Sequence, residues 1–261
     1  MHHMIDHALK RAKHLGPSVE LDVGNCWDIE NPELPNSLKI NRSGGGSLFG
    51  CADINPLLPP GKSATMNIKG SGCSIFIGEN FKTRFSHFIV EGTDSTIIIG
   101  PNCRLLDVTI KVVGSGAIVI IGGGTTWEGG AMLNNANDGT SKTIIVGNDC
   151  MLSSDVNLRT ADGHSMWQAG GQERIDKSGD IVIGNHVWLG NGSRVARGSR
   201  IGNGAVLGQR SFLSATMEPF TAYAGVPARK VRDRVEWSRT TSYDDIPERY
   251  RWKEMDDCEN C

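Results

Sequence analysis

The sequence predicts an all-β protein that folds as a parallel β-helix with about three short strands in each coil. Between residues 183 and 213 an aliphatic residue recurs at every sixth position. These residues are Ile183, Leu189, Val195, Ile201, Leu207 and Leu213. Glycine follows four of the six, and a small or branched residue stands two positions before each of the later ones. Six is a multiple of the strand period of two and does not fit a helix turn, so each short strand can direct one aliphatic side chain inward.

Composition and charge narrow the range of functions. The chain of 261 residues is long enough to bury a core, and its 33 glycines and 6% aromatic residues suit tight corners and thin strands. A formal net charge of −2 favours neither nucleic acid nor an anionic membrane as a partner. The N-terminal stretch has no apolar core of signal-peptide length, and the apolar runs elsewhere are too short to span a bilayer. We therefore expect a cytoplasmic protein with no membrane insertion.

Residues 1–60 show no repeat, and we expect them to form an N-terminal capping segment. Within it, Ile5 to Leu15 fits a short amphipathic helix that ends at Gly16 and Pro17. The remainder is rich in proline, glycine and asparagine. A solenoid end exposes unpaired backbone, so irregular strands are expected to cover the open first coil.

Residues 61–222 are predicted to form the solenoid itself. An aliphatic residue followed by glycine marks a corner at Ile77, Ile99, Ile121, Val146 and Ile183, with gaps of 22, 22, 25 and 37 residues. A coil of three hexapeptides needs about 18 residues, so each gap is one coil plus a side loop. The last gap therefore contains a loop of about 19 residues, which we place at residues 159–181. Long loops in a compact repeat fold are usually functional.

Residues 223–261 are predicted to form a C-terminal helical tail. The segment Gly225 to Lys230 fits a turn that leads into a short helix, with Pro227 near its first turn. A second short helix is expected from Ile246 to Glu254.

The seven cysteines do not indicate a disulfide framework or a zinc site. Cys103 and Cys150 occupy small inward positions of the repeat, so they are expected in the core. Cys258 and Cys261 form a single CxxC without a second pair of ligands, and we expect free thiols there.

His164 is the histidine that the sequence singles out for chemistry. It opens the long loop, beside Gly163 and between acidic and aromatic residues, whereas the other six histidines fit surface groups. Histidine titrates near neutrality, so a positioned imidazole can accept a proton from a hydroxyl and later return it.

The segment from Gly147 to Trp237 resembles the acetyl-CoA-dependent hexapeptide acetyltransferases, the group that holds the galactoside, maltose and xenobiotic acetyltransferases. The resemblance is carried, in order, by DCMLSSDVNLRTADGH, IVIGNHVWLGNGSRV, RIGNGAVLG and AGVPARKVR. The segments DGHSMW and VRDRVEW are most similar to those of O-acetyltransferases of surface polysaccharides. The resemblance implies a left-handed β-helix, which departs from the usual right-handed crossover. It also implies acetyl-CoA as co-substrate, no required metal, and a homotrimer with its sites in the clefts between subunits.

The same resemblance assigns catalytic roles. His164 falls on the family's catalytic histidine, which would take the proton of a sugar hydroxyl as that hydroxyl attacks the thioester carbonyl. Backbone N–H groups would hold the developing oxyanion. By position Glu173 resembles the glutamate that orients the far ring nitrogen, although a solvated loop charge explains it equally well. Asp155 and Asp162 compete with Glu173 for this role.

Cofactor contacts also follow from the resemblance. Trp188 falls on the tryptophan that lies against the acyl and pantetheine end of the cofactor, with packing on a neighbouring subunit as the alternative. Backbone groups along the edge at Gly190 and Gly208 are implied contacts of CoA. Arg229 and Lys230 suit its phosphates as a cationic pair, although either could be a solvated charge.

For the acceptor, the polar loop before Val146 offers the hydrogen-bonding groups that sugar recognition needs. The candidate acceptor-binding residues are Asn134, Asn137, Asp138, Asp155 and Asp162.

The function expected from these features is transfer of an acetyl group from acetyl-CoA to a hydroxyl of a surface polysaccharide or its precursor. N-acetylation of a nucleotide-linked amino sugar on the same fold stays open. A zinc enzyme like the γ-carbonic anhydrases would need three histidines at one metal, for which only His87, His164 and His186 are candidates. A purely structural solenoid would leave the long loop unexplained.

Overall fold

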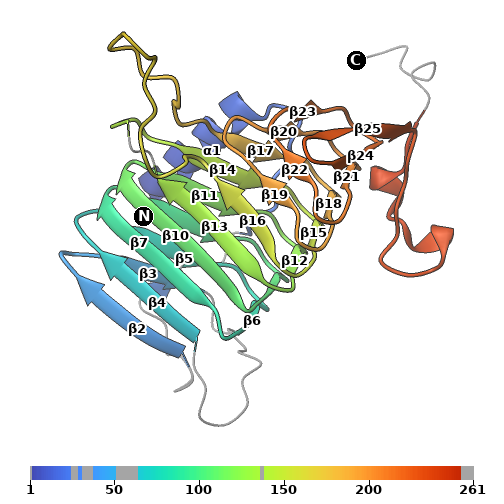
Figure 1. Ribbon diagram of the computed structural model, residues 1–261. Helices are drawn as coiled ribbons and strands as arrows, with labels where there is room; N and C mark the ends of the chain where they lie inside the picture. Colours follow the sequence, from blue (N-terminus) through green and yellow to red (C-terminus); the bar gives the residue numbers. More distant parts are fainter. Residues whose placement is uncertain (1, 25–28, 31–37, 51–63, 136–137, 254–261) are drawn as a thin grey trace.

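The computed structural model shows a three-sided parallel β-helix, and among the described residues a single α-helix lies on its flank (Figure 1). It describes residues 2–24, 29–30, 38–50, 64–135 and 138–253. From residue 64 onwards the chain passes repeatedly through three sheets, which we call sheet II, sheet I and sheet III in the order in which the chain meets them. The coils are those of the left-handed β-helix that the resemblance implied. None of the described helices is long and apolar enough to cross a membrane.

Sheet I runs the length of the solenoid. In spatial order its strands are β1 (Ile29–Glu30), β3 (Ser47–Gly50), β5 (Ser74–Ile77), β8 (Thr96–Ile99), β11 (Ile118–Ile121), β14 (Thr143–Val146), β17 (Ile181–Ile183), β20 (Arg200–Ile201) and β23 (Thr216–Met217). Apart from the antiparallel β1–β3 pair, its described neighbours pair in parallel.

Sheets II and III complete the prism. Sheet II contains β2 (Leu38–Ser43), β4 (Ala64–Lys69), β7 (His87–Thr93), β10 (Val108–Ser115), β13 (Gly130–Asn135), β16 (Val156–Arg159), β19 (Arg194–Val195) and β22 (Phe212–Leu213). Sheet III contains β6 (Lys82–Arg84), β9 (Arg104–Leu106), β12 (Thr126–Trp127), β15 (Met151–Leu152), β18 (Trp188–Leu189), β21 (Val206–Leu207), β24 (Thr221–Gly225) and β25 (Ala228–Asp233).

The inner core is a set of stacked columns, as the six-residue period predicts. Along sheet I the corner residues pair from coil to coil, so that Ile99 lies between Ile77 and Ile121, and Val146 lies between Ile121 and Ile183. All of these side chains are buried in one continuous cluster. Cys103 and Cys150 belong to the same cluster, and burial raises the pKa of both thiols to about 12, so the prediction that they are core residues is confirmed. Cys258 and Cys261 lie outside the described residues.

A second cluster lies on the outer surface of sheet I, under helix α1 (His2–Leu15). Ile5, Ala8 and Ala12 of the helix pack against outward side chains such as Ile120 and Ile145. Strands β5, β8, β11 and β14 are consequently buried on both faces, which agrees with the run of three or four consecutive apolar residues in each.

The N-terminal region differs from the expected capping segment in two ways. The amphipathic helix forms where it was predicted, and it covers the outer surface of sheet I, a position that the sequence analysis did not predict. The solenoid also begins earlier than residue 61, because β2 and β3 pair in parallel with β4 and β5. The reason for the helix position is the apolar outer surface of sheet I, which would otherwise face water.

The expected C-terminal helices are wrong. After Gly225, whose φ is +98°, residues 228–233 form strand β25 and pair antiparallel with β24. This hairpin satisfies backbone groups at a sheet edge that would otherwise be open, which a helix at the same place could not do. Further on, the chain forms two short 3₁₀ turns, η1 (Tyr243–Asp245) and η2 (Glu248–Tyr250), in place of a helix from Ile246.

The stacked core should be the main source of stability. Ile144 is fully buried in the inner cluster, whereas Val231 is 64% exposed. Replacing Ile144 with alanine is expected to lower the free energy of unfolding by about 2–5 kcal/mol, because it leaves a cavity. Val231→Ala should change it by no more than about 0.5 kcal/mol. Urea denaturation followed by circular dichroism measures both, and equal effects would contradict this description of the core.

Candidate active site

One outward-facing row of side chains crosses sheet III from coil to coil. The strands place its members in direct register, in the order Arg104, Thr126, Met151, Trp188, Val206 and Ala222. Each is partly exposed, while the next residue of each of the first five strands points into the core or beneath the surface. Trp188 therefore lies in the middle of a surface row, with Met151 on one side and Val206 on the other.

A cavity of about 500 Å³ opens on the Met151 side of Trp188. Its lining, which we call the sheet III cavity, consists of Arg104, Thr126, Glu128, Met151, Ser153, Ser154 and Arg239. Arg104 forms an ion pair with Glu128. The indole N–H of Trp188 donates to Ser153 Oγ at 3.3 Å, which connects the tryptophan to the cavity wall.

The other side of Trp188 carries the residues expected to bind the cofactor. A Cβ at Gly190 would lie 2.6 Å from the backbone nitrogen of Gln209, so the next coil passes too close for any other residue. Gly208 lies in the following coil, where a Cβ would come within 3.1 Å of Ala224. Arg229 and Lys230 follow on β25, at the edge of the same sheet.

The two cations of this edge differ in their surroundings. The ammonium of Lys230 lies 2.8 Å from Glu218 and 3.0 Å from Asp233, and hydrogen bonds to these carboxylates raise its pKa. The guanidinium of Arg229 is exposed and donates to the carbonyl of Ala228 at 3.1 Å. Arg229 is thus the better placed of the pair to bind a phosphate, because its charge is not matched by a nearby carboxylate in the described chain.

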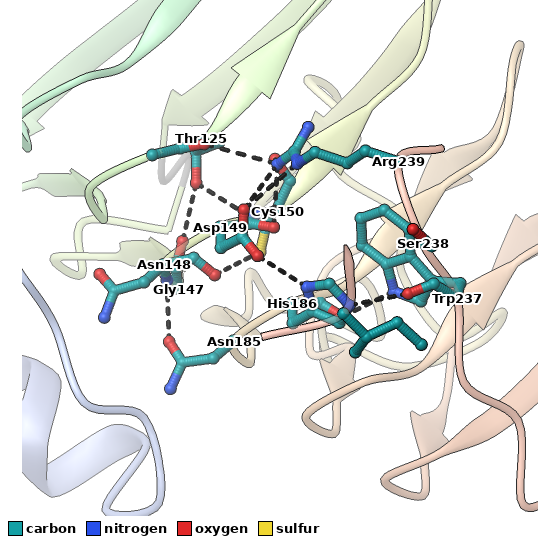
Figure 2. Close-up of polar contacts among 12 residues, drawn as sticks. Thr125, Gly147, Asn148, Asp149, Cys150, Asn185, His186, Trp237, Ser238 and Arg239 are labelled. Atoms are coloured by element: carbon teal, nitrogen blue, oxygen red, sulfur yellow. Dashed lines mark hydrogen bonds and ion pairs between the residues drawn. The ribbon is translucent and has the colours of Figure 1, made fainter. Parts of the chain in front are cut away.

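A buried histidine fastens the C-terminal segment to the solenoid (Figure 2). The ring of His186 lies between Trp237 and Tyr250, with centroid distances of 4.1 and 5.0 Å and nearly parallel planes. Its Nε2 is 3.0 Å from the carbonyl oxygen of Trp237, while the indole N–H of Trp237 donates to the carbonyl of His186 at 2.8 Å. We call this arrangement the His186 latch. The reading of His186 as a surface group is wrong, because the residue is 2% exposed.

The latch continues through Asp149 to Arg239. One carboxylate oxygen of Asp149 lies 2.8 Å from His186 Nδ1, and the other accepts from the Arg239 guanidinium at 3.1 Å. Burial acts to raise the pKa of this carboxyl, but the hydrogen bond to His186 and the charge of Arg239 hold it below its usual value. Arg239 also donates to Thr126 Oγ1 and to the carbonyl of Cys150. These bonds hold Arg239, which belongs to the C-terminal segment, against the solenoid (Figure 2), where it forms part of the wall of the sheet III cavity.

The long loop, residues 160–180, joins β16 to β17 and projects from the solenoid (Figure 1). We call it the flap. Its outer part is a small hairpin in which Ile175 donates its N–H to the carbonyl of Met166 at 3.0 Å. Arg174, which pairs with Trp167 in this hairpin, donates to the fully buried Asp176 at 2.8 Å, and this hydrogen bond lowers the pKa of the Asp176 carboxyl to about 2.

His164 and Glu173 are both exposed on the flap. Within the described part of the chain, neither side chain has a hydrogen-bond partner. The expected orientation of the His164 ring by Glu173 is thus not formed in a single chain. Three large apolar side chains of the same hairpin are exposed as well, Met166 by 49%, Trp167 by 56% and Ile175 by 52%.

The flap and the Trp188 surface lie on opposite sides of one chain. The flap leaves at the corner between sheets II and I, and in a three-sided prism that corner faces away from sheet III. Figure 1 shows the flap and the C-terminal segment at opposite sides of the solenoid. A single chain therefore does not bring His164 to Trp188.

The residues expected to bind the acceptor are held in structural contacts. Asn134 is fully buried, and its amide nitrogen donates to the carbonyls of Ile118 and Lys142 at 2.8 Å. Asp138 accepts hydrogen bonds from Ser178 and Thr140. Desolvation acts to raise the pKa of this carboxyl, but the hydrogen bonds outweigh it and the pKa lies below its usual value. Asp138 thereby secures the base of the flap.

Of the remaining acceptor candidates, two are engaged in ion pairs and one lies outside the described residues. Asp155 is paired with Arg194 at 3.1 Å, and Asp162 is paired with Arg197. Asn137 lies outside the described residues. The prediction of an acceptor site at Asn134 is wrong, because its side chain faces the interior.

The three histidines considered for a metal do not converge. His87 lies on β7 of sheet II and its Nδ1 is 2.7 Å from Thr65 Oγ1, whereas His186 forms the latch and His164 is on the flap. Among the described residues no group of three or more His, Cys, Asp or Glu side chains is placed to hold a metal ion.

Comparisons with known proteins agree with this architecture. The bacterial transferase hexapeptide (six repeats) family matches residues 180–215. The chain is 30% identical over 125 residues to the polysialic acid O-acetyltransferase of Neisseria meningitidis, which covers 48% of this chain and 56% of that protein. It is 39% identical over 129 residues to the polysialic acid O-acetyltransferase of Escherichia coli O1:K1 / APEC, which covers 49% of this chain and 41% of that protein. The chain thus spans about half the length of these curated relatives.

Among solved structures, the chain is similar to the polysialic-acid-specific acetyltransferase NeuO. The TM-score is 0.66 at 25% sequence identity, and the similarity covers 80% of this chain and 93% of that one.

The latch should determine how firmly the C-terminal segment is held. Replacing His186 with phenylalanine keeps a ring between Trp237 and Tyr250 but removes both ring hydrogen bonds. Amide hydrogen exchange of residues 237–250 is expected to accelerate by about tenfold or more, since each lost bond to a charged or buried partner costs about 1–3 kcal/mol. His87→Phe serves as the control, because His87 is an exposed histidine on sheet II. Unchanged exchange in the His186 variant would show that the latch does not hold the segment.

Proposed function

We propose that this chain, which carries the bacterial transferase hexapeptide repeat, is an O-acetyltransferase that moves an acetyl group from acetyl-CoA to a saccharide hydroxyl. The observation that carries the proposal is the shared fold and sequence with polysialic acid O-acetyltransferases, together with an exposed histidine on the one long flap. The acceptor class is a surface polysaccharide or its precursor, since the named acceptor of these relatives is polysialic acid. Use of acetyl-CoA as donor is consistent with a cytoplasmic location.

The donor would bind along sheet III on the β21 to β25 side of Trp188. Trp188 would contact the acyl and pantetheine end, and the backbone at Gly190 and Gly208 would follow the rest of the chain. One feature supports this placement. The cationic residues Arg229 and Lys230 lie at the far end of the same sheet. Of the two, Arg229 is the stronger candidate for a phosphate contact, because Lys230 already has two carboxylate partners.

His164 would act as general base. It takes the proton of the acceptor hydroxyl as the oxygen bonds to the thioester carbonyl carbon, and it returns that proton to the sulfur of CoA as the carbon–sulfur bond breaks. The acetyl group passes directly to the sugar, so no covalent enzyme intermediate forms. Glu173, exposed on the same hairpin, is the carboxylate proposed to orient the imidazole.

A complete site would need two copies of the chain. His164 and Trp188 lie on opposite sides of one solenoid, so the flap of one copy must reach sheet III of a neighbour. The exposed Met166, Trp167 and Ile175 give the flap an apolar surface suited to such a contact. A cyclic homotrimer, in which every copy gives its flap to one neighbour and receives a flap from the other, satisfies this geometry.

Loss of the histidine should abolish transfer without unfolding the protein. His164→Ala is expected to lower kcat at least about a hundredfold, the usual contribution of a general base. Its circular dichroism should match that of the wild type, because the side chain is exposed and makes no described contact. Release of free CoA thiol in the presence of acceptor measures turnover, and wild-type turnover in this variant would remove the assignment.

Mixing His164→Ala with Trp188→Ala should restore activity if sites form between copies, because the first variant lacks the general base and the second lacks the proposed contact to the acyl end, so each alone is expected to be nearly inactive. His164→Ala retains the Trp188 surface, and Trp188→Ala retains the flap. In randomly mixed cyclic trimers about a quarter of the interfaces combine an intact His164 with an intact Trp188, so activity near a quarter of wild type is expected. The variants are refolded together and compared with each variant refolded alone. If mixing restores nothing above the separate variants, the two residues do not share an intersubunit site.

A further inference from the structure

We propose that the sheet III cavity is the acceptor subsite, in which Glu128 and Arg104 bind hydroxyl groups of the saccharide and Arg239 completes the wall. This inference rests on the proposed acetyl transfer and assigns its acceptor to a surface different from the asparagine-rich loop. The cavity is formed by β9, β12 and β15 and by the C-terminal segment.

The position of the cavity along sheet III supports this assignment. In the spatial order of the strands, β18 with Trp188 separates β9, β12 and β15 from β21, β24 and β25. If the donor occupies the β21 to β25 side, its acyl end stops at Trp188 and the cavity begins at the adjacent Met151. An acceptor in the cavity would therefore meet the acetyl group end-on, without crossing the path of the cofactor.

The chemistry of the wall fits a hydroxyl-rich ligand better than a phosphate. Its charges are matched, because Arg104 is paired with Glu128 and Arg239 is paired with Asp149. A phosphate would find little net positive charge there, whereas sugar hydroxyls can both donate to a carboxylate and accept from a guanidinium. Thr126, Ser153 and Ser154 add hydroxyl groups that can serve in either role. The volume of about 500 Å³ lies within the usual range for small-molecule sites.

The wall is also held rigid before any ligand arrives. Arg239 donates to Thr126 Oγ1 at 2.7 Å, to the carbonyl of Cys150 at 3.0 Å and to Asp149. Asp149 is in turn fixed by His186, whose ring lies between two aromatic side chains. His186 is therefore a positioning residue that acts on the cavity through Asp149 and Arg239. A preorganised wall lowers the entropy lost on binding.

The region predicted from sequence lacks these properties. The amide of Asn134 is buried and faces the inside of the solenoid, and Asp138 is used by Ser178 and Thr140. In contrast, Arg104 and Glu128 each keep 41% of their side-chain surface exposed at the cavity. They can exchange part of their ion pair for contacts with a ligand at small cost, since exposed pairs contribute little to stability.

The decisive experiment measures steady-state kinetics of Glu128→Gln and Arg104→Gln with acetyl-CoA and a panel of acceptors that contains polysialic acid and neutral oligosaccharides. Each variant is expected to raise the acceptor KM about fivefold or more, with the KM for acetyl-CoA unchanged. Glu91→Gln is the matched control, because Glu91 forms a similar exposed ion pair with Lys69 on sheet II. It should leave both KM values unchanged.

A third variant tests the positioning role of His186. His186→Phe should also raise the acceptor KM and leave the acetyl-CoA KM unchanged, whereas a purely structural role would lower activity without this separation. His186→Gln, which keeps a hydrogen-bonding side chain, is expected to recover part of the acceptor affinity.

The outcomes separate the two proposals. If the wild type transfers acetyl groups to a saccharide while Glu128→Gln and Arg104→Gln keep wild-type acceptor KM values, the cavity is not the acceptor subsite and the proposed function stands. If the wild type transfers acetyl groups to none of the saccharides, the proposed function fails, and the assignment of the cavity fails with it.

Discussion

The register between successive coils is the constraint on which the rest of the structure depends. Parallel pairing aligns each strand with the same strand of the next coil, so inward residues such as Ile121 and Val146 must stack on one another. The same register arranges the outward residues. Trp188 lies between Met151 and Val206 because Leu189 lies between Leu152 and Leu207. The packing of the core thus fixes the order of the side chains on the surface of sheet III.

The sequence period is sufficient to predict the coil but not the elements that pack around it. The six-residue period predicts the columns and the position of the flap, because each depends only on local spacing. It does not say that helix α1 covers sheet I. The indication was present in strands such as IVII at Ile118–Ile121, where unbroken apolar residues require burial on both faces. Pro227 was ambiguous, since a proline that can begin a helix can also close a hairpin, and the open edge of β24 decides for the hairpin.

The candidate site shows the same division between local and distant contacts. His164 could be singled out from the sequence, because the flap it opens is the longest interruption of the repeat. The role of His186 could not be predicted, since its ring is held by Trp237, which lies 51 residues away in the sequence. Likewise, the sequence suggests that Asn134 is a polar loop residue. Only the three-dimensional structure shows that its side-chain amide donates hydrogen bonds to backbone carbonyl groups inside the solenoid. Sequence spacing therefore identifies exposed candidate catalytic residues better than it identifies polar side chains that form hydrogen bonds within the fold.

Helix α1 has a consequence for how copies of the chain could assemble. Its apolar side chains share one buried cluster with Phe76, Ile98, Ile120 and Ile145, which lie on the outer surface of four successive strands of sheet I. That side of the prism is already packed by its own chain and offers mostly the polar back of the helix, including Lys10, Lys13 and His14, to solvent. In the proposed assembly the two uncovered sides of the solenoid would therefore be the ones that meet a neighbour, because the helix acts as an intramolecular mask over the third side.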